Sequence, residues 1–112
     1  MTINGVELEF DLLDYETAKA YEEALERVQK ESALCQKKKA ISVSASIKEQ
    51  CEMVNRFFDK VFGAGTSQAI FGGKMNLNVA IEAFEAVIEE AAHQKEAFSS
   101  RINKNISKWK AC

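Results

Sequence analysis

The hydrophobic and polar positions follow an alternating pattern at the start of the chain. Every second residue from Val6 to Phe10 is apolar, which is the period of a half-buried strand. The preceding Asn4-Gly5 pair favours the positive φ angles of a two-residue type I′ turn. Residues 1–12 are therefore predicted to form a short β-hairpin, which needs a packing partner because isolated hairpins are marginally stable.

From residue 14 onward the apolar positions recur at spacings of three and four, which is typical of amphipathic helices. The first helix is predicted over residues 14–37, with the Asp14 carboxylate as its N-cap. The second is predicted over residues 46–62. It begins with Ser46 and Glu49 in the spacing of a capping box, in which each side chain satisfies a backbone donor of the other residue.

The last helix is the longest, predicted over residues 77–110 with Asn76 as its N-cap. A helix of that length would span about 50 Å, whereas a compact domain of this size has a radius of gyration of about 13 Å. Its second half, beyond His93, is therefore expected to project, to bend or to be covered by another subunit. The apolar face that continues there is a possible interaction surface, formed by Phe98, Ile102, Ile106 and Trp109.

Residues 63–76 are rich in glycine and phenylalanine and end in Gly-Gly-Lys, which raises the possibility of a phosphate-binding loop. That loop requires a serine or threonine after the lysine, but Lys74 is followed by Met75. It also requires a glycine where Gln68 stands, and a strand where a phenylalanine-rich helix is predicted. Nucleotide binding is thus not expected, and the segment is interpreted as a structural elbow containing a short helical turn, Thr66 to Phe71.

Together these segments predict one domain, residues 1–112, of mainly α class. A short N-terminal β-hairpin is followed by three helices, with the Gly/Phe-rich elbow before the long C-terminal helix. There is no run of about 18 apolar residues and the N-terminus lacks the pattern of a signal peptide, so no membrane association and a cytoplasmic location are expected. The three cysteines, an odd number without close pairs, are interpreted as free thiols: Cys35, Cys51 and Cys112.

Charge is unevenly distributed, although the net charge is only −2. Residues 1–34 carry nine acidic and three basic side chains, whereas residues 95–112 carry five basic and one acidic side chain. An acidic head and a basic tail favour self-association, or a fold that brings the two ends together. A homo-oligomer is therefore expected.

Candidate chemistry is sparse. Glu89 and His93 share a helix face, but two ligands are too few for a metal site. Adjacent acidic pairs such as Glu22 and Glu23 point in different directions around a helix. The basic run at 37–39 lacks interleaved aromatic residues, which disfavours nucleic-acid binding. The sequence therefore predicts no catalytic residue, no cofactor and no metal, and a protein that is not an enzyme.

The elbow carries a resemblance to known sequences. The segment "FFDKVFGAGTSQAIFGGKMNLNVAIEAFEAVIE" and the opening "INGVELEFDLLDYETAKAYEEAL" resemble a family of small uncharacterised phage and prophage proteins of Gram-positive bacteria. Such proteins are similar in size and helix content to phage tail assembly chaperones. The resemblance implies a cytoplasmic factor, acting in a bacterial host, that binds a tail protein such as the tape-measure protein. It assigns no functional residue.

Two functions of different classes follow as expectations. The first is a non-enzymatic assembly factor that binds another phage protein, and the alternative is a structural component of the virion. The two differ in whether the protein stays in purified particles. A small enzyme or a nucleic-acid binder is a second alternative. The near-neutral net charge disfavours the nucleic-acid binder.

Overall fold

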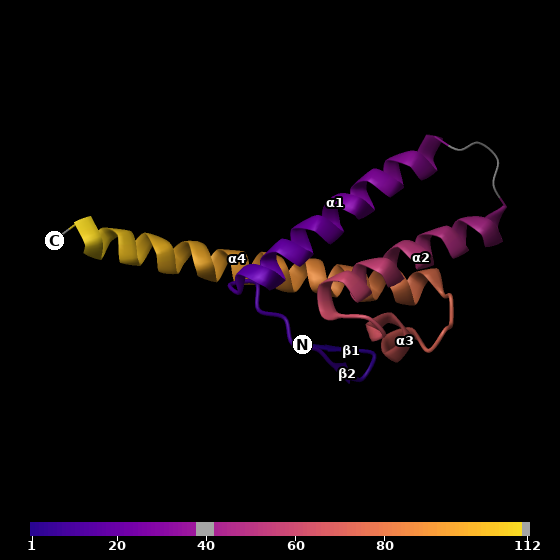
Figure 1. Cartoon of the computed structure of the whole chain (residues 1–112), viewed down its shortest axis with the longest axis horizontal. Coiled ribbons are helices and arrows are strands. Elements are labelled where there is room, and N and C mark those ends of the chain that lie inside the picture. The colour runs from indigo at the N-terminus through magenta and orange to yellow at the C-terminus, as the bar shows by residue number, and fades with distance from the viewer. Residues whose placement is uncertain (38–41, 111–112) are drawn as a thin grey trace.

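The computed structural model describes residues 1–37 and 42–110, with the side chains of residues 1–34 and 42–104. A two-stranded hairpin, β1 (Thr2–Ile3) and β2 (Val6–Glu7), precedes the helices. Figure 1 shows the helices in chain order: α1 (Tyr15–Lys37), α2 (Val43–Phe62), α3 (Thr66–Phe71) and α4 (Leu77–Lys110). The mainly α class with an N-terminal hairpin and a long last helix is confirmed.

The hairpin forms as its turn residues predict. Asn4 and Gly5 have φ angles of 50° and 78°, the positive values that a type I′ turn requires at both central positions. The antiparallel ladder is shorter than predicted. It pairs Ile3 with Val6 and Thr2 with Glu7. The alternation of burial nevertheless continues to the buried ring of Phe10, so the apolar face of the segment still packs on the helices.

Two of the predicted helix N-caps are confirmed. The Asp14 carboxylate accepts a hydrogen bond from the backbone N–H of Thr17 at 3.2 Å. The side-chain oxygen of Asn76 accepts one from the N–H of Val79 at 3.1 Å. Each cap satisfies a backbone donor that the first turn leaves without an intrahelical partner.

The start of α2 differs from the prediction. The helix begins at Val43, and its N-cap is Ser42, whose hydroxyl accepts the N–H of Ala45 at 3.2 Å. Ser46 already lies inside the helix, since its N–H donates to the Ser42 carbonyl at 3.0 Å. The capping box expected at Ser46 and Glu49 is therefore wrong. Either serine could serve as a cap, and the earlier one adds nearly a full turn of backbone hydrogen bonds.

The second helix is the centre of the fold, because α1, α3 and α4 all pack against it. Phe57 and Phe58 are almost fully buried near its C-terminal end. Their rings meet those of Phe84 and Phe71 edge to face, with centroid separations of 4.9 and 5.7 Å. Burying each such side chain contributes roughly 1.5–3 kcal/mol, and edge-to-face pairs add about 0.5–1.5 kcal/mol.

The elbow is built by backbone conformation and one acidic side chain. The predicted helical turn is confirmed as α3, and the glycines at both its ends, Gly65 and Gly72, adopt left-handed conformations. Asp59 reaches back from α2 to the start of α3. Its two carboxylate oxygens accept the N–H and the hydroxyl of Ser67 at 2.9 and 3.0 Å.

The helix caps of α3 and the Asp59 contacts indicate that residues 63–76 act as a structural elbow. The side chain of Asn4 also donates to the Ile70 carbonyl at 3.3 Å, which ties the hairpin turn to α3. Ile70 is buried in the same core as Phe58. The segment is preceded by a helix, as the interpretation as an elbow requires.

The molecule is elongated, with principal extents of 62 × 33 × 20 Å and a radius of gyration of 17.0 Å. Figure 1 shows the cause: the first half of α4 lies beneath α1 and α2, and its second half extends away from them. Of the alternatives expected for α4 beyond His93, the single chain shows a projecting helix. We call residues 95–110 of α4 the projecting arm.

Candidate functional site

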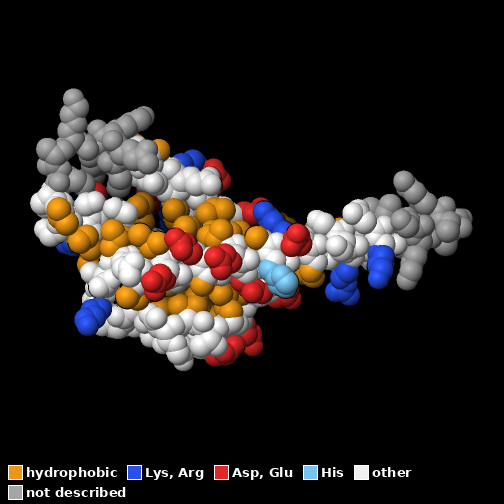
Figure 2. Space-filling model, turned by 180° about the vertical axis from the view of Figure 1, so that it is seen from behind, with side chains coloured by type: hydrophobic (Ala, Val, Ile, Leu, Met, Phe, Trp, Pro, Cys, Tyr) orange, Lys and Arg blue, Asp and Glu red, His pale blue; other side chains and the backbone are white. Residues whose placement is uncertain are grey.

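An apolar groove of about 680 Å³ lies between α1 and α4. We call it the α1–α4 groove. Side chains from both helices line it along about three turns of each, and its apolar lining comes from Leu25, Val28, Ala33, Phe84, Ile88 and Ala92. Figure 2 shows hydrophobic side chains gathered on this side of the body, whereas basic side chains stand out on the projecting arm.

The groove stays open because α1 is held from its other side. Ala24 is buried against α2, and two ion pairs join the same helices. Lys60 contacts Glu23 at 3.2 Å, and Arg56 contacts Glu31. Exposed ion pairs contribute only about 0.2–1 kcal/mol each. They lie on the face of α1 that meets α2, and the neighbouring face of α1 is left toward α4.

The α4 wall of the groove belongs to an apolar stripe wider than one helix contact requires. Ala83 and Val87 are buried in the core, with relative exposures of 4% and 0%. Phe84 and Ile88, one position further around the helix, are only partly buried and line the groove. One face of α4 thus completes the core and the adjoining face remains accessible.

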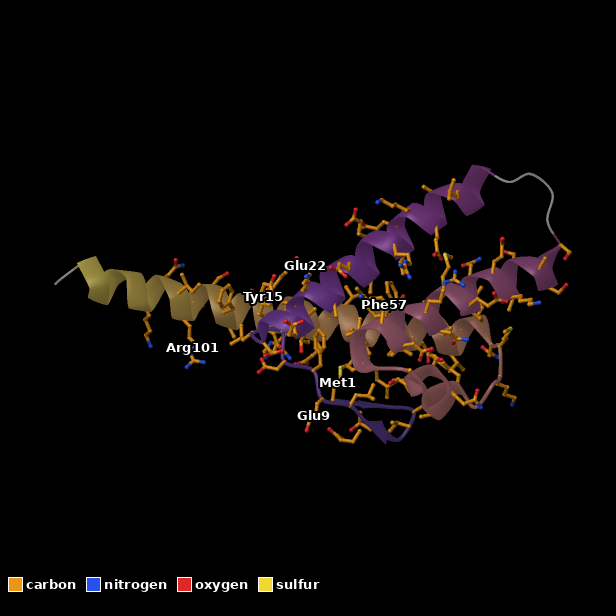
Figure 3. All side chains as sticks on the ribbon, in the orientation of Figure 1. Met1, Glu9, Tyr15, Glu22, Phe57 and Arg101 are labelled. Carbon is orange, nitrogen blue, oxygen red and sulfur yellow. The ribbon has the colours of Figure 1, made fainter. Side chains whose placement is uncertain are left out.

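A second hollow of about 310 Å³ adjoins the groove where the projecting arm begins. Tyr21 and Lys95 line both spaces, so the two lie next to each other. Its apolar side chains are unusually exposed: Leu13 by 48%, Tyr15 by 71% and Phe98 by 43%. Figure 3 shows Tyr15 and Glu22 on the first turns of α1, beside the point where α4 leaves the body.

The amide of Gln94 fixes the floor of this junction. Its nitrogen donates to the Phe10 carbonyl at 2.8 Å, and its oxygen accepts the N–H of Leu12 at 2.6 Å. One side chain therefore satisfies both a donor and an acceptor of the segment between β2 and α1. The contact positions Leu12 and Leu13 next to α4.

The titratable side chains that line the groove are Tyr21 and Lys95. Burial raises the pKa of the Tyr21 phenol, so the ring stays neutral at physiological pH. It packs edge to face against Phe10 and Phe57, at centroid distances of 5.7 and 6.1 Å. A neutral phenol and one ammonium offer hydrogen bonding and a positive charge, while the rest of the lining offers apolar contact.

The structure places two of the four residues of the predicted interaction surface. Phe98 and Ile102 are exposed by 43% and 38% on the projecting arm, as a surface for contact requires. Ile106 and Trp109 lie within α4, but their side chains are outside the described part of the chain. Sequence reasoning missed the α1–α4 groove itself. The available signal was the width of the α4 stripe, with Phe84 and Ile88 beside the alanine and valine positions.

Other predicted residues are placed singly. Glu89 and His93 are exposed on α4, and the described residues contain no cluster of three or more His, Cys, Asp or Glu side chains that could hold a metal ion. Cys51 is a free, buried thiol, and burial raises its pKa. The side chains of Cys35 and Cys112 lie outside the described residues. None of the described helices combines the length and apolarity needed to cross a membrane.

Comparison with known families gives one match, to the model described as a family of unknown function, DUF6673, over residues 4–111. The chain belongs to the family DUF6673. The match includes β2, every described helix and both walls of the groove, so the candidate site lies inside the region that defines DUF6673. Searches of curated proteins and of solved structures gave no match.

Proposed function

We propose that this DUF6673 protein is a non-enzymatic binding factor that holds an apolar helical segment of a partner protein in the α1–α4 groove. The observation that carries the proposal is the groove itself, an open apolar channel of about 680 Å³ between two helices. Helix-binding proteins use this arrangement, in which an amphipathic helix lays its apolar face into a hydrophobic groove.

The lining favours a protein segment over a small polar ligand. Sites for small ligands place a few polar groups so that they converge on the bound molecule. Here the polar lining residues are spread along the groove: Gln29 and Ser32 on α1, and Lys95 on α4. The described residues also contain no buried polar or charged residue that could orient a substrate.

The proposed partner is another phage protein, and the specific role is that of a tail assembly chaperone. This step is supported by the sequence resemblance of the elbow and the N-terminal segment to phage proteins. The tape-measure protein is the candidate to test first. In this role the DUF6673 protein would cover an apolar segment of the tail protein in the bacterial cytoplasm until assembly.

The test is co-purification from cells that express the protein together with the tail proteins encoded beside it. Two groove variants, Ala33→Glu and Ala92→Glu, place a carboxylate at exposed positions of the groove wall, so folding should be preserved. Ala69→Glu makes the same change at an exposed position of α3. We expect both groove variants to lose the partner and the α3 variant to keep it. Retention of the partner by all three variants would overturn the proposal.

The alternative role as a structural virion component gives a different result. A chaperone is absent from purified particles, whereas a structural component is present in them at a fixed ratio to other tail proteins. Mass spectrometry of purified particles separates these outcomes. Nucleic acid that co-purifies with the wild-type protein, and is lost on Lys104→Ala, would instead favour the nucleic-acid binder.

A further inference from the structure

We propose that, when no partner protein is bound, the α1–α4 groove of one copy holds the projecting arm of a second copy, and that the two copies exchange arms reciprocally. The inference uses the groove of the proposed function but concerns self-association. It commits to a second copy as the occupant because the chain itself carries both complementary surfaces. They are an open apolar groove and an exposed amphipathic helix.

The arm has the form that such a groove accepts. Phe98 and Ile102 are one helical turn apart and are exposed by 43% and 38%. Ser99 and Ser100 are exposed as well and give the arm a polar side. The arm therefore presents an apolar stripe on a polar helix, which is the form that lies in hydrophobic grooves. Left in water, an apolar stripe of this kind usually marks an interface.

The lengths of arm and groove agree. On α4 the groove wall extends from Phe84 to Lys95, a distance of about 16 Å at 1.5 Å per residue. The arm from Phe98 to the helix end at Lys110 covers about 18 Å by the same measure. An arm laid along the groove would therefore match it in length.

Reciprocal exchange follows from symmetry. A two-fold axis near the junction of the groove and the arm, between Lys95 and Phe98, would set the two α4 helices antiparallel. Each arm would then lie along the groove wall of the other copy, in an isologous contact that closes on itself as a dimer. The exposed Leu13 and Tyr15, which adjoin Phe98, would be covered at the centre of this contact.

Charge favours the same arrangement. Arg101 is exposed on the arm, and Glu22 is exposed on α1 beside the junction of the groove and the arm. Within residues 1–34 and 42–104 neither side chain takes part in an ion pair. Figure 3 shows Glu22 on α1 in the body and Arg101 on the arm, well separated within one copy. Opposite charges across two copies would steer association and set its direction more than its strength.

The first experiment compares two substitutions on adjacent parts of the arm by sedimentation. Ile102→Glu places a charge in the apolar stripe, whereas Ser100→Glu places the same charge on the opposite side of the helix. Both residues are exposed, so neither change should disturb folding. We expect wild type and Ser100→Glu to be dimers at about 100 μM, with Ile102→Glu raising the dissociation constant by about 30-fold or more. A monomeric wild type, or dimerisation unchanged by Ile102→Glu, would overturn the inference.

The second experiment tests whether the arm reaches the groove of the other copy. One chain carries Glu22→Lys, and the other carries Arg101→Glu. Each variant alone sets like charges against one another across the dimer, whereas a mixture restores opposite charges at both contacts. We expect each variant to be mostly monomeric alone and the mixture to form a heterodimer. If the mixture dimerises no better than either variant, the arm does not meet α1 of its partner, and the inference fails.

The two proposals fail separately. Ile102→Glu alters the arm and leaves the groove intact, so it should abolish the dimer while co-purification with a tail protein persists or increases. Loss of the tail protein in the Ala33→Glu variant tests the proposed function alone, because the readout is the partner and not the oligomeric state.

Discussion

The two halves of α4 share one apolar periodicity but differ in what covers it. In the first half, Ala83, Val87 and Ala91 are buried to at least 96% in a core completed by α2. In the second half, Phe98 and Ile102 continue the stripe with about 40% of their surface exposed. The difference teaches that a helical pattern specifies which side of a helix is apolar, but not which molecule covers it. The fully buried positions of the first half carry small side chains, and the exposed positions of the second half carry large ones.

The largest effect is expected when one ring is removed from the packed body and one from the projecting arm. Phe58 has a relative exposure of 0%, so Phe58→Ala should destabilise the protein by about 3–5 kcal/mol through lost burial and a residual cavity. Phe98→Ala, in dilute protein, should cost far less. Chemical denaturation of both variants measures the difference. Equal losses would mean that the arm is as well packed as the body.

A second test acts at the boundary between the halves. Gln94→Ala removes both hydrogen bonds to the backbone of Phe10 and Leu12 and should cost about 1–3 kcal/mol. Gln94→Glu keeps an acceptor for Leu12 but sets a carboxylate against the Phe10 carbonyl and the Glu90 carboxylate, so it should destabilise the protein as well. Hydrogen exchange at the Leu12 amide should accelerate in Gln94→Ala. An unchanged exchange rate would show that the side chain does not hold this segment.

A third test uses alkaline pH. Burial raises the pKa of Tyr21 above its usual value of 10.0, so the folded state favours the protonated phenol. That contribution to stability is fully present below pH 10 and is lost as the pH rises through the folded-state pKa. Tyr21→Phe should therefore reduce the alkaline loss of stability, whereas Tyr15→Phe, at a residue 71% exposed, should leave it unchanged. Denaturation curves at pH 8 to about pH 11 compare the two variants. Identical alkaline losses in both would contradict the assignment.

The smallest expected effect belongs to the arm. Ile102→Ala at micromolar concentration should change the free energy of unfolding by no more than about 0.5 kcal/mol, because an exposed side chain loses little on truncation. Thermal melts of dilute protein check this. A loss well above that value would show that Ile102 is packed within its own chain.

Local features were predictable from the sequence because their causes lie within a few residues. The Asn4-Gly5 turn, the Asp14 and Asn76 caps and the short helix of the elbow all follow from neighbouring side chains. The start of α2 was missed because Ser42 and Ser46 are equally good caps, and only the fold selects between them.

The groove could not be predicted, because it depends on how far apart two distant helices lie. Leu25 and Ile88 look like core residues in the sequence, and both are in fact only partly buried in a groove wall. The Gln94 contact was missed for a related reason. A glutamine on a helix face gives no signal that its amide will meet backbone 82 and 84 positions earlier in the chain.

That long sequence separation has a consequence for how the protein is made. The hairpin and the segment after it are synthesised before their partners: the segment bonds the amide of Gln94, and Asn4 of the hairpin turn bonds the carbonyl of Ile70, 66 positions away. At the usual speed of translation, Gln94 follows the hairpin by about 4–16 s. During that interval the Phe10 carbonyl and the Leu12 N–H lack the side chain that pairs with them in the folded protein. We therefore expect this segment to reach its final position only after Gln94 has left the ribosome.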